Sequence, residues 1–288
     1  MSEIKKIQED ILTLHELGDL MTTYQEIAAI RMRKVKKYVL QNREFLSGLS
    51  KLYKRVHISY YEANEFEKQR LNRYMGKKEG NVSVLLASNT GLYGDIVEKT
   101  FWLFADNIRN TDTEVVIIGK IGKALYDGVG IKKEYRFFEF PDSGVDDTKL
   151  KKILEYITTF TNIIVYHGLF RTVLIQDPKK TFLTGDALAI QQEIETKEKE
   201  EERIKVLFEP SMEELVKFFE TQIIGTVFEH IIYESSLSKF ASRMVSLERA
   251  AGNIEDEIGK QKFVLIKEKH RENDSKQRDI LSSAKMWS

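Results

Sequence analysis

Apolar side chains recur at alternating spacings of three and four along residues 4–56, the pattern of a helix that packs lengthwise against another helix. The stripe continues for about seven heptads, and only Gly18, Gln25 and Asn42 interrupt it. A helix over residues 3–58 would be roughly 80 Å long at about 1.5 Å per residue. A compact core needs no helix of that length, so we expect an extended helix that pairs along its length.

The C-terminal part repeats this pattern, with apolar positions in the same alternation from Val216 to Leu265. Ser211 is the expected N-cap of this helix, and Glu214 completes a capping box. A helix over residues 211–285 would be about 110 Å long. Its final stretch, KEKHRENDSKQRDILSS, keeps helix-forming residues but loses the apolar stripe. We therefore expect the C-terminal helix to extend beyond its partner.

The residues between these two stretches alternate between short β-branched runs and helical patterns, which is typical of an α/β sheet domain. Strands are expected at Val82–Ala87, Val115–Gly119 and Ile163–Tyr166, and helices near 93–109, 120–127 and 147–160. A charge-dense connector (194–205) and a short strand, VLFEP (206–210), are expected to follow. All prolines lie in this central part, so the long terminal helices meet no proline barrier.

These elements predict a mixed α+β and α/β fold, in which the N- and C-terminal helices form a long antiparallel coiled coil and the centre is a Rossmann-like α/β domain. We expect an N-terminal coiled-coil helix (1–62), a central α/β foot domain (80–208) and a C-terminal coiled-coil helix (209–288). One helix leads into the foot and the other leads out of it, so an antiparallel pair is the economical arrangement.

Composition narrows the class of protein. The chain has 45 basic and 45 acidic residues, so its net charge gives no electrostatic case for nucleic acid as a partner. It has no cysteine, which excludes disulfides and thiolate zinc sites and indicates a reducing compartment. No stretch is long and apolar enough for a transmembrane helix, and the first residues lack a signal-peptide pattern. We expect a cytosolic protein or one peripheral to a membrane.

A glycine-containing turn after the first expected strand is the best candidate for enzymatic chemistry. It reads SNTGLYGD, with Gly91 and Gly94, and a second glycine segment follows at 119–125. Neither segment has the glycine spacing of a dinucleotide or P-loop motif, so a structural turn is the favoured interpretation. The alternative is a Rossmann-like enzyme with a coiled-coil arm, in which Gly91, Gly94 and Lys120 would bind phosphate.

Other candidate groups are weaker still. The histidines are scattered without the spacing of metal ligands, and we expect each to be an isolated surface or interface residue; they are His15, His57, His167, His230 and His270. The segment IRMRKVKK (30–37) carries five positive charges, either as a solvated face or as a contact for an acidic loop of a partner. No nucleophile and base pair stands out, and no catalytic residue or metal site is predicted.

Five segments in order along the chain resemble the gamma subunit of rotary F-type ATP synthases. EIAAIRMRK (26–34) is similar to that family's A-A-S-K-M-R-K helix, and SNTGLYGDI (88–96) to its S-x-D-R-G-L-C-G-G-L loop. IIGKIGK (117–123) resembles its I-G-x-K-G stretch, and VLFEP (206–210) its Y-L-Y-E-P strand. The most specific match is ESSLSKFASRMVSLERAAGN (234–253), which resembles E-x-x-x-S-E-x-x-A-R-M-x-A-M-x-x-A-T-x-N.

The resemblance implies a non-catalytic rotor shaft that transmits torque between a membrane rotor ring and a hexamer of α and β subunits. It implies no cofactor on this chain, because ATP, ADP and Mg²⁺ would bind to the partner subunits. It implies that the foot rests on the rotor ring and on a small epsilon-type subunit, as part of a complex at the cytoplasmic face of the cell membrane.

The resemblance also implies the contact residues. Those expected to lie where the shaft meets β-subunit loops are Tyr24, Arg31, Arg33, Lys34, Arg243, Arg271, Glu272 and Arg278. Those expected in the foot contact with the ring and the epsilon-type subunit are Gly91, Tyr93, Gly94, Phe208 and Glu209.

Several positions depart from the family's pattern. Tyr24 replaces a usual methionine, Glu272 a usual glutamine, and Arg278 stands where an acidic residue is common. In the foot loop, Thr90 replaces an arginine and Asp95 a glycine. These changes leave a second interpretation open, in which the same kind of shaft drives a different load, such as the gliding apparatus of wall-less bacteria.

Overall fold

A computed structural model describes residues 3–61, 78–183 and 212–285 of the chain. Its two longest elements are the helices α1 (Glu3–Tyr61) and α7 (Met212–Lys285), of 59 and 74 residues. The helices predicted over 3–58 and 211–285 are thus confirmed. The expected connector, the strand VLFEP with Phe208 and Glu209, and the N-cap Ser211 all lie outside the described residues.

The contacts divide the chain into two compact units, and each long helix contributes to both. One consists of Met1–Ala29 and Arg243–Ser288 and is called the coil unit below. The other consists of Ile30–Ser242 and is called the α/β unit.

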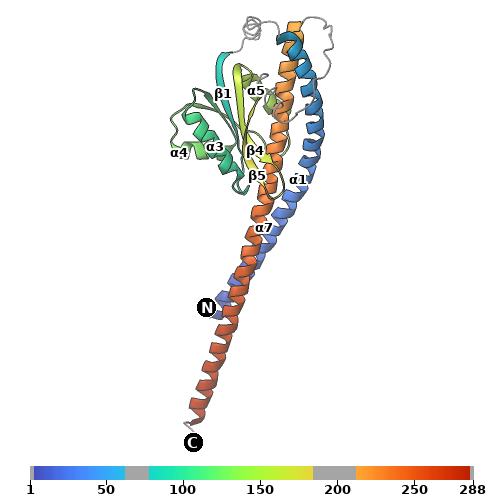
Figure 1. Cartoon of the computed structure of the whole chain (residues 1–288). Coiled ribbons are helices and arrows are strands. Elements are labelled where there is room, and N and C mark those ends of the chain that lie inside the picture. The colour runs from blue at the N-terminus through green and yellow to red at the C-terminus, as the bar shows by residue number, and fades with distance from the viewer. Residues whose placement is uncertain (1–2, 62–77, 184–211, 286–288) are drawn as a thin grey trace. The chain divides into compact units, whose positions relative to one another are not determined.

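In the coil unit, the first half of α1 and the second half of α7 form an antiparallel pair (Figure 1). Ile7 and Ala28 on α1 and Leu247 and Ile258 on α7 are buried, as the apolar stripes predicted. Gly18 interrupts the stripe, and a Cβ at this position would lie 3.7 Å from the side chain of Ile254. Beyond this pair α7 continues alone, and every residue from 269 to 283 is exposed (Figure 1). The C-terminal helix therefore extends past its partner, as predicted.

The α/β unit contains a five-stranded sheet in the order β3-β2-β1-β4-β5. The strands are β1 (Lys78–Leu86), β2 (Glu114–Ile118), β3 (Tyr135–Phe138), β4 (Phe160–Phe170) and β5 (Gln176–Phe182). The first four run parallel, and β5 returns antiparallel to β4 through a short turn. The sequence predicted β1, β2 and β4 but missed the two edge strands. Of these, β5 carries Pro178 and two lysines, a composition that is compatible with an edge.

Apolar side chains cover both faces of this sheet. One face packs on α5 (Asp147–Ile157) and on α7, with Val84, Ile153 and Phe228 fully buried. The other packs on α3 (Ile96–Arg109) and α4 (Lys120–Val129), and the same cluster includes Val35, Leu237 and Phe240 of the long helices. Burial on two faces explains why β1 and β2 read as continuous apolar runs. None of the described helices has both the length and the apolar character that a membrane span requires.

Candidate functional site

The glycine loop, residues 87–95, connects the carboxyl end of β1 to the first turn of α3. Because β1 lies between β2 and β4, this edge is where the strand order reverses, and open α/β sheets usually bind ligands at such a point. Two residues of the loop have left-handed backbone angles, Leu92 with φ 64° and Gly94 with φ 59°. Leu92 is 62% exposed, whereas the side chain of Tyr93 is buried against Phe240.

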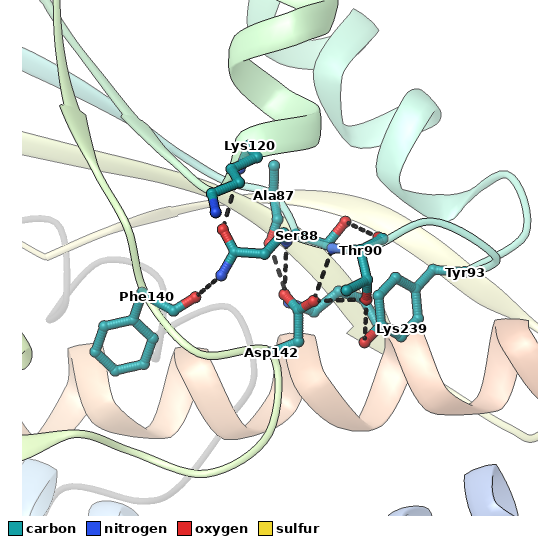
Figure 2. Close-up of polar contacts among 9 residues, drawn as sticks. Ala87, Ser88, Thr90, Tyr93, Lys120, Phe140, Asp142 and Lys239 are labelled. Carbon is teal, nitrogen blue, oxygen red and sulfur yellow. Dashed lines mark hydrogen bonds and ion pairs between the residues drawn. The ribbon is translucent and has the colours of Figure 1, made fainter.

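The anion position of this loop is taken by a carboxylate of the chain itself (Figure 2). Asp142 accepts hydrogen bonds from the backbone N–H of Asn89, at 2.9 Å, and of Thr90, at 3.0 Å. It also accepts one from the hydroxyl of Thr90, at 2.9 Å. Consecutive backbone N–H groups of this kind bind phosphate in nucleotide-binding loops. Here they are already satisfied by Asp142.

The loop is also fastened to the start of α4. The Asn89 side chain donates to the carbonyl of Phe140 and accepts from the backbone N–H of Lys120 at 3.2 Å. The ammonium of Lys120 lies 3.0 Å from the carboxylate of Glu139, in an exposed ion pair. Lys120, the expected phosphate ligand of the enzyme hypothesis, is thus held in protein contacts.

The second glycine segment serves close packing. Gly119 has φ 103°, and a Cβ there would lie 2.7 Å from the carbonyl oxygen of Ser88. A Cβ on Gly122 would lie 2.6 Å from the Cβ of Ala87. Both glycines let the backbone of α4 approach the end of β1, which accounts for their spacing without a ligand.

A buried lysine completes the network. The ammonium of Lys239, on α7, donates to the carbonyl of Ala87 at 3.0 Å and lies 3.8 Å from a carboxylate oxygen of Asp142 (Figure 2). Burial lowers the pKa of Lys239, and the neighbouring Asp142 opposes that shift. Sequence reasoning missed both residues. The available signal was a lysine between Leu237 and Phe240 on the apolar side of a predicted helix.

A second group of buried polar residues lies between β4, β5 and α7. His167 is 1% exposed, and its Nε2 lies 2.9 Å from the hydroxyl of Thr181. Burial lowers the pKa of His167 to about 4, although the charge of Glu234 works in the opposite direction. On α7, Nε2 of His230 lies 3.5 Å from the Glu234 carboxylate. His167 and His230 were expected to be isolated, but the fold brings both close enough to the Glu234 carboxylate to interact with it electrostatically.

The expected shaft contacts are distributed along the two long helices. Most of them are exposed: Tyr24, Arg31, Arg33, Lys34, Arg271, Glu272 and Arg278; Arg243 is half-buried. The C-terminal residues make local contacts, with Arg271 3.6 Å from Glu268 and Glu272 2.8 Å from Lys276. Of the expected foot contacts, Gly91 and Gly94 are exposed.

Comparison with known proteins gives consistent results over nearly the whole chain. A family model described as ATP synthase matches residues 3–271. Among similar relatives, the ATP synthase gamma chain of Rickettsia felis is 22% identical over 279 residues, covering 90% of this chain and 91% of that one. The gamma chain of Mesoplasma florum is 23% identical over 258 residues, covering 88% and 87%.

Solved structures show the same fold. One is the OSCP/F1/c-ring part of the Euglena gracilis mitochondrial ATP synthase. A chain of that structure matches with a TM-score of 0.56 at 14% identity, and the match covers 92% of the present chain and 94% of the Euglena chain. Another is the central stalk and c-ring of the Tetrahymena thermophila mitochondrial enzyme, with a TM-score of 0.54 at 15% identity, covering 80% and 99%.

Proposed function

The chain belongs to the ATP synthase family as a divergent gamma chain, the non-catalytic central-stalk subunit, and from this premise we propose how its parts transmit torque. The chain acts as the rotor shaft of an F1-type ATPase, turning inside a hexamer of α and β subunits. The observation that carries this proposal is the antiparallel pair of α1 and α7, which continues as a single helix through residue 285. A long pair of this kind is stiff along its length and offers partners a surface without a pocket.

The shaft would act on the hexamer by differential contact. Each orientation of an asymmetric surface favours a different conformation of the neighbouring subunit, so turning the shaft shifts conformational populations in sequence. We assign the contacts with β-subunit loops to the exposed side chains of Tyr24, Arg31 and Arg33 on α1 and of Arg271 and Glu272 on α7. Lys34, Arg243 and Arg278 complete this set. The exposure of all of these residues except the half-buried Arg243 supports the assignment.

We further propose that this chain binds no nucleotide or other cofactor, and that ATP, ADP and Mg²⁺ bind to its partners. The filled anion position of the glycine loop supports this, because a phosphate there would have to displace the carboxylate of Asp142 from the two backbone N–H groups. The competing interpretation, an enzyme using Gly91, Gly94 and Lys120, predicts measurable binding of ATP or NAD to the isolated chain. We expect none by isothermal titration calorimetry.

We propose that the foot of the chain, residues 80–208, binds a membrane rotor ring and an epsilon-type subunit at the cytoplasmic face of the membrane. Gly91 and Gly94 are exposed, which is compatible with such contacts, whereas the ring of Tyr93 is buried and would support the loop from inside. Contact residues Phe208 and Glu209 belong to the same proposal.

Affinity purification of the chain from its own host tests these assignments. We expect α- and β-type subunits to copurify in about threefold molar excess over the chain, in line with a closed ring around one shaft. Copurification of ring subunits would support the membrane load. A hexamer recovered repeatedly without ring subunits, but with other components, would instead favour a load such as a gliding apparatus. Recovery of the chain alone would contradict the shaft.

A further inference from the structure

The face that α7 turns toward the sheet is unusually polar between residues 230 and 242. Ser235, Ser236, Ser238 and Ser242 are all at most 4% exposed, and they lie among the buried apolar side chains of Ile231, Ile232, Leu237 and Phe240. Among the described residues, the hydroxyls of Ser235 and Ser238 find no hydrogen-bond partner. Gly168 of β4 packs against this face, since a Cβ there would lie 2.8 Å from the Ser238 hydroxyl.

The serine side chains add little to what holds this stretch of α7 in position on the sheet. Burial of apolar area is non-directional, and small hydroxyl side chains contribute little of it. A directional contact would therefore add to the apolar packing that fixes this stretch of α7 on the sheet. Charge-assisted hydrogen bonds supply direction and are roughly twice as strong as neutral ones.

Lys239 makes one hydrogen bond of this kind and one ion pair. Its ammonium reaches the Ala87 carbonyl at 3.0 Å and stands 3.8 Å from the Asp142 carboxylate. The side chains of Lys239 and Asp142 are only 7% and 10% exposed, so water weakens this interaction little. The lysine also lies over the ring of Tyr93, 5.9 Å from its centroid.

Asp142 extends the connection into the glycine loop. Its carboxylate binds the backbone of Asn89 and Thr90 at the same time as it faces Lys239 (Figure 2). One lysine on α7 is thereby joined directly to the end of β1 and, through Asp142, to the loop that precedes α3. Together Lys239, Asp142 and the loop residues 87–90 are called the clamp below.

We propose that this clamp is the torque linkage between the shaft helix α7 and the α/β unit, with Lys239 as its positioning residue. The proposal rests on the proposed function, because it concerns a chain that turns inside a hexamer. When α7 is twisted, the clamp adds a directional contact to the apolar packing of α7 on the sheet, so that the sheet and its load follow the helix.

The clamp also predicts an asymmetry between its two charges. Removing the Asp142 charge leaves the buried ammonium of Lys239 with the Ala87 carbonyl and the Tyr93 ring but no counter-charge. Removing the ammonium leaves Asp142 with three hydrogen-bond donors. Breaking a buried pair costs most when an uncompensated charge remains. Asp142→Asn should therefore lower the urea midpoint of the full chain more than Lys239→Met does.

Torsional stiffness tests the proposal directly. The chain has no cysteine, and Leu174, at the turn between β4 and β5, is 76% exposed, so Leu174→Cys gives a single attachment point on the α/β unit. The full chain carrying this change is assembled with the surface-fixed αβ hexamer, and a bead on the cysteine reports angular fluctuations during catalytic pauses. Four versions are compared: Lys239 intact, Lys239→Met, Lys239→Arg, and Lys120→Met as a control that removes an exposed ion pair near the same loop.

Lys239→Met should broaden the angular variance about twofold, because a charge-assisted contact is replaced by non-directional packing. Lys239→Arg should recover most of the stiffness, and Lys120→Met should match the parent chain. Equal variance in Lys239→Met and the parent, or equal broadening by Lys120→Met, would overturn the proposal. If Lys239→Met fails to fold, the uncharged double variant Lys239→Met with Asp142→Asn replaces it, with the same two outcomes.

The same experiment distinguishes failure of the proposed function from failure of the clamp. If the parent chain does not assemble with the hexamer and the bead never rotates, the proposed function is wrong. If it rotates normally and its stiffness ignores Lys239, only the clamp is wrong.

Discussion

Mild acid should destabilise the α/β unit, because His167 is buried in a site that holds it neutral. In the unfolded chain a histidine has a pKa of about 6.5, whereas burial lowers the pKa of His167 to about 4 in the folded protein. Between these two values the unfolded chain binds a proton that the folded chain does not. The free energy of unfolding therefore falls as pH falls from about 6.5 to about 4, and the loss is complete below the folded pKa.

The size of the effect follows from the two pKa values. Each tenfold ratio of acid constants is worth about 1.36 kcal/mol, so the shift from 6.5 to about 4 corresponds to about 3 kcal/mol in full. At pH 5 the loss should already be about 2 kcal/mol relative to pH 7.5. That amount is a substantial part of the roughly 5–15 kcal/mol by which folded domains are stable.

Urea unfolding at pH 7.5 and pH 5 provides the assay. Fluorescence of Trp102 on α3 reports the α/β unit, and a Trp287→Phe background leaves it as the only tryptophan. His167→Gln keeps a polar group near the Thr181 hydroxyl but cannot take up the proton. From pH 7.5 to pH 5, the free energy of unfolding of this variant should therefore fall by about 2 kcal/mol less than that of the parent chain. His270→Gln, at an exposed position of α7, is the matched control and should keep the parent's pH dependence.

Equal pH dependence of the parent chain and His167→Gln would refute this reasoning. An NMR titration of the histidine rings in the folded chain offers an independent check. A midpoint near 6.5 for His167 would show that burial does not hold the ring neutral.

Three further outcomes are expected. Gly122→Ala should destabilise the α/β unit by about 1–3 kcal/mol, because the new Cβ would overlap the Cβ of Ala87. Gly128→Ala adds a Cβ in open space on the same helix and should not destabilise the unit. The urea midpoints of the two variants distinguish these outcomes. Truncation after Leu265 removes residues of the coil unit only, so it should weaken torque in single-molecule rotation but leave the Trp102 unfolding transition unchanged. Loss of that transition would contradict the division of the chain into these two units. Arg271→Ala, which removes an exposed charge, should alter rotation of the complex while changing the stability of the isolated chain by less than about 0.5 kcal/mol.

The long helices could be predicted from sequence because their signal is local and repeated. Apolar positions at helical spacing and the lack of prolines predict α1 and α7 without any knowledge of their tertiary contacts. The buried strands β1, β2 and β4 were recognisable for a related reason, since burial on both faces leaves continuous β-branched runs. The edge strands β3 and β5 lack that signal, because they are only partly buried, and their pairing depends on neighbours far away in the chain.

The glycine loop shows where local pattern stops being informative. Its residues correctly indicated a turn from strand to helix, but nothing in SNTGLYGD shows what satisfies its backbone N–H groups. The partner is Asp142, more than fifty residues away, and the lysine facing Asp142 comes from α7, 152 residues from Ala87. His167 and His230 likewise looked isolated until the sheet and α7 brought both near Glu234.

The periodic elements, the order of the parts and the likeness to a rotor shaft could be read from the sequence, because each depends on residues that are close together or on motifs read in order. Only the folded chain shows which charges are buried together and which loop they hold. Burial and electrostatic pairing depend on distances between segments, and those distances exist only once the chain has folded.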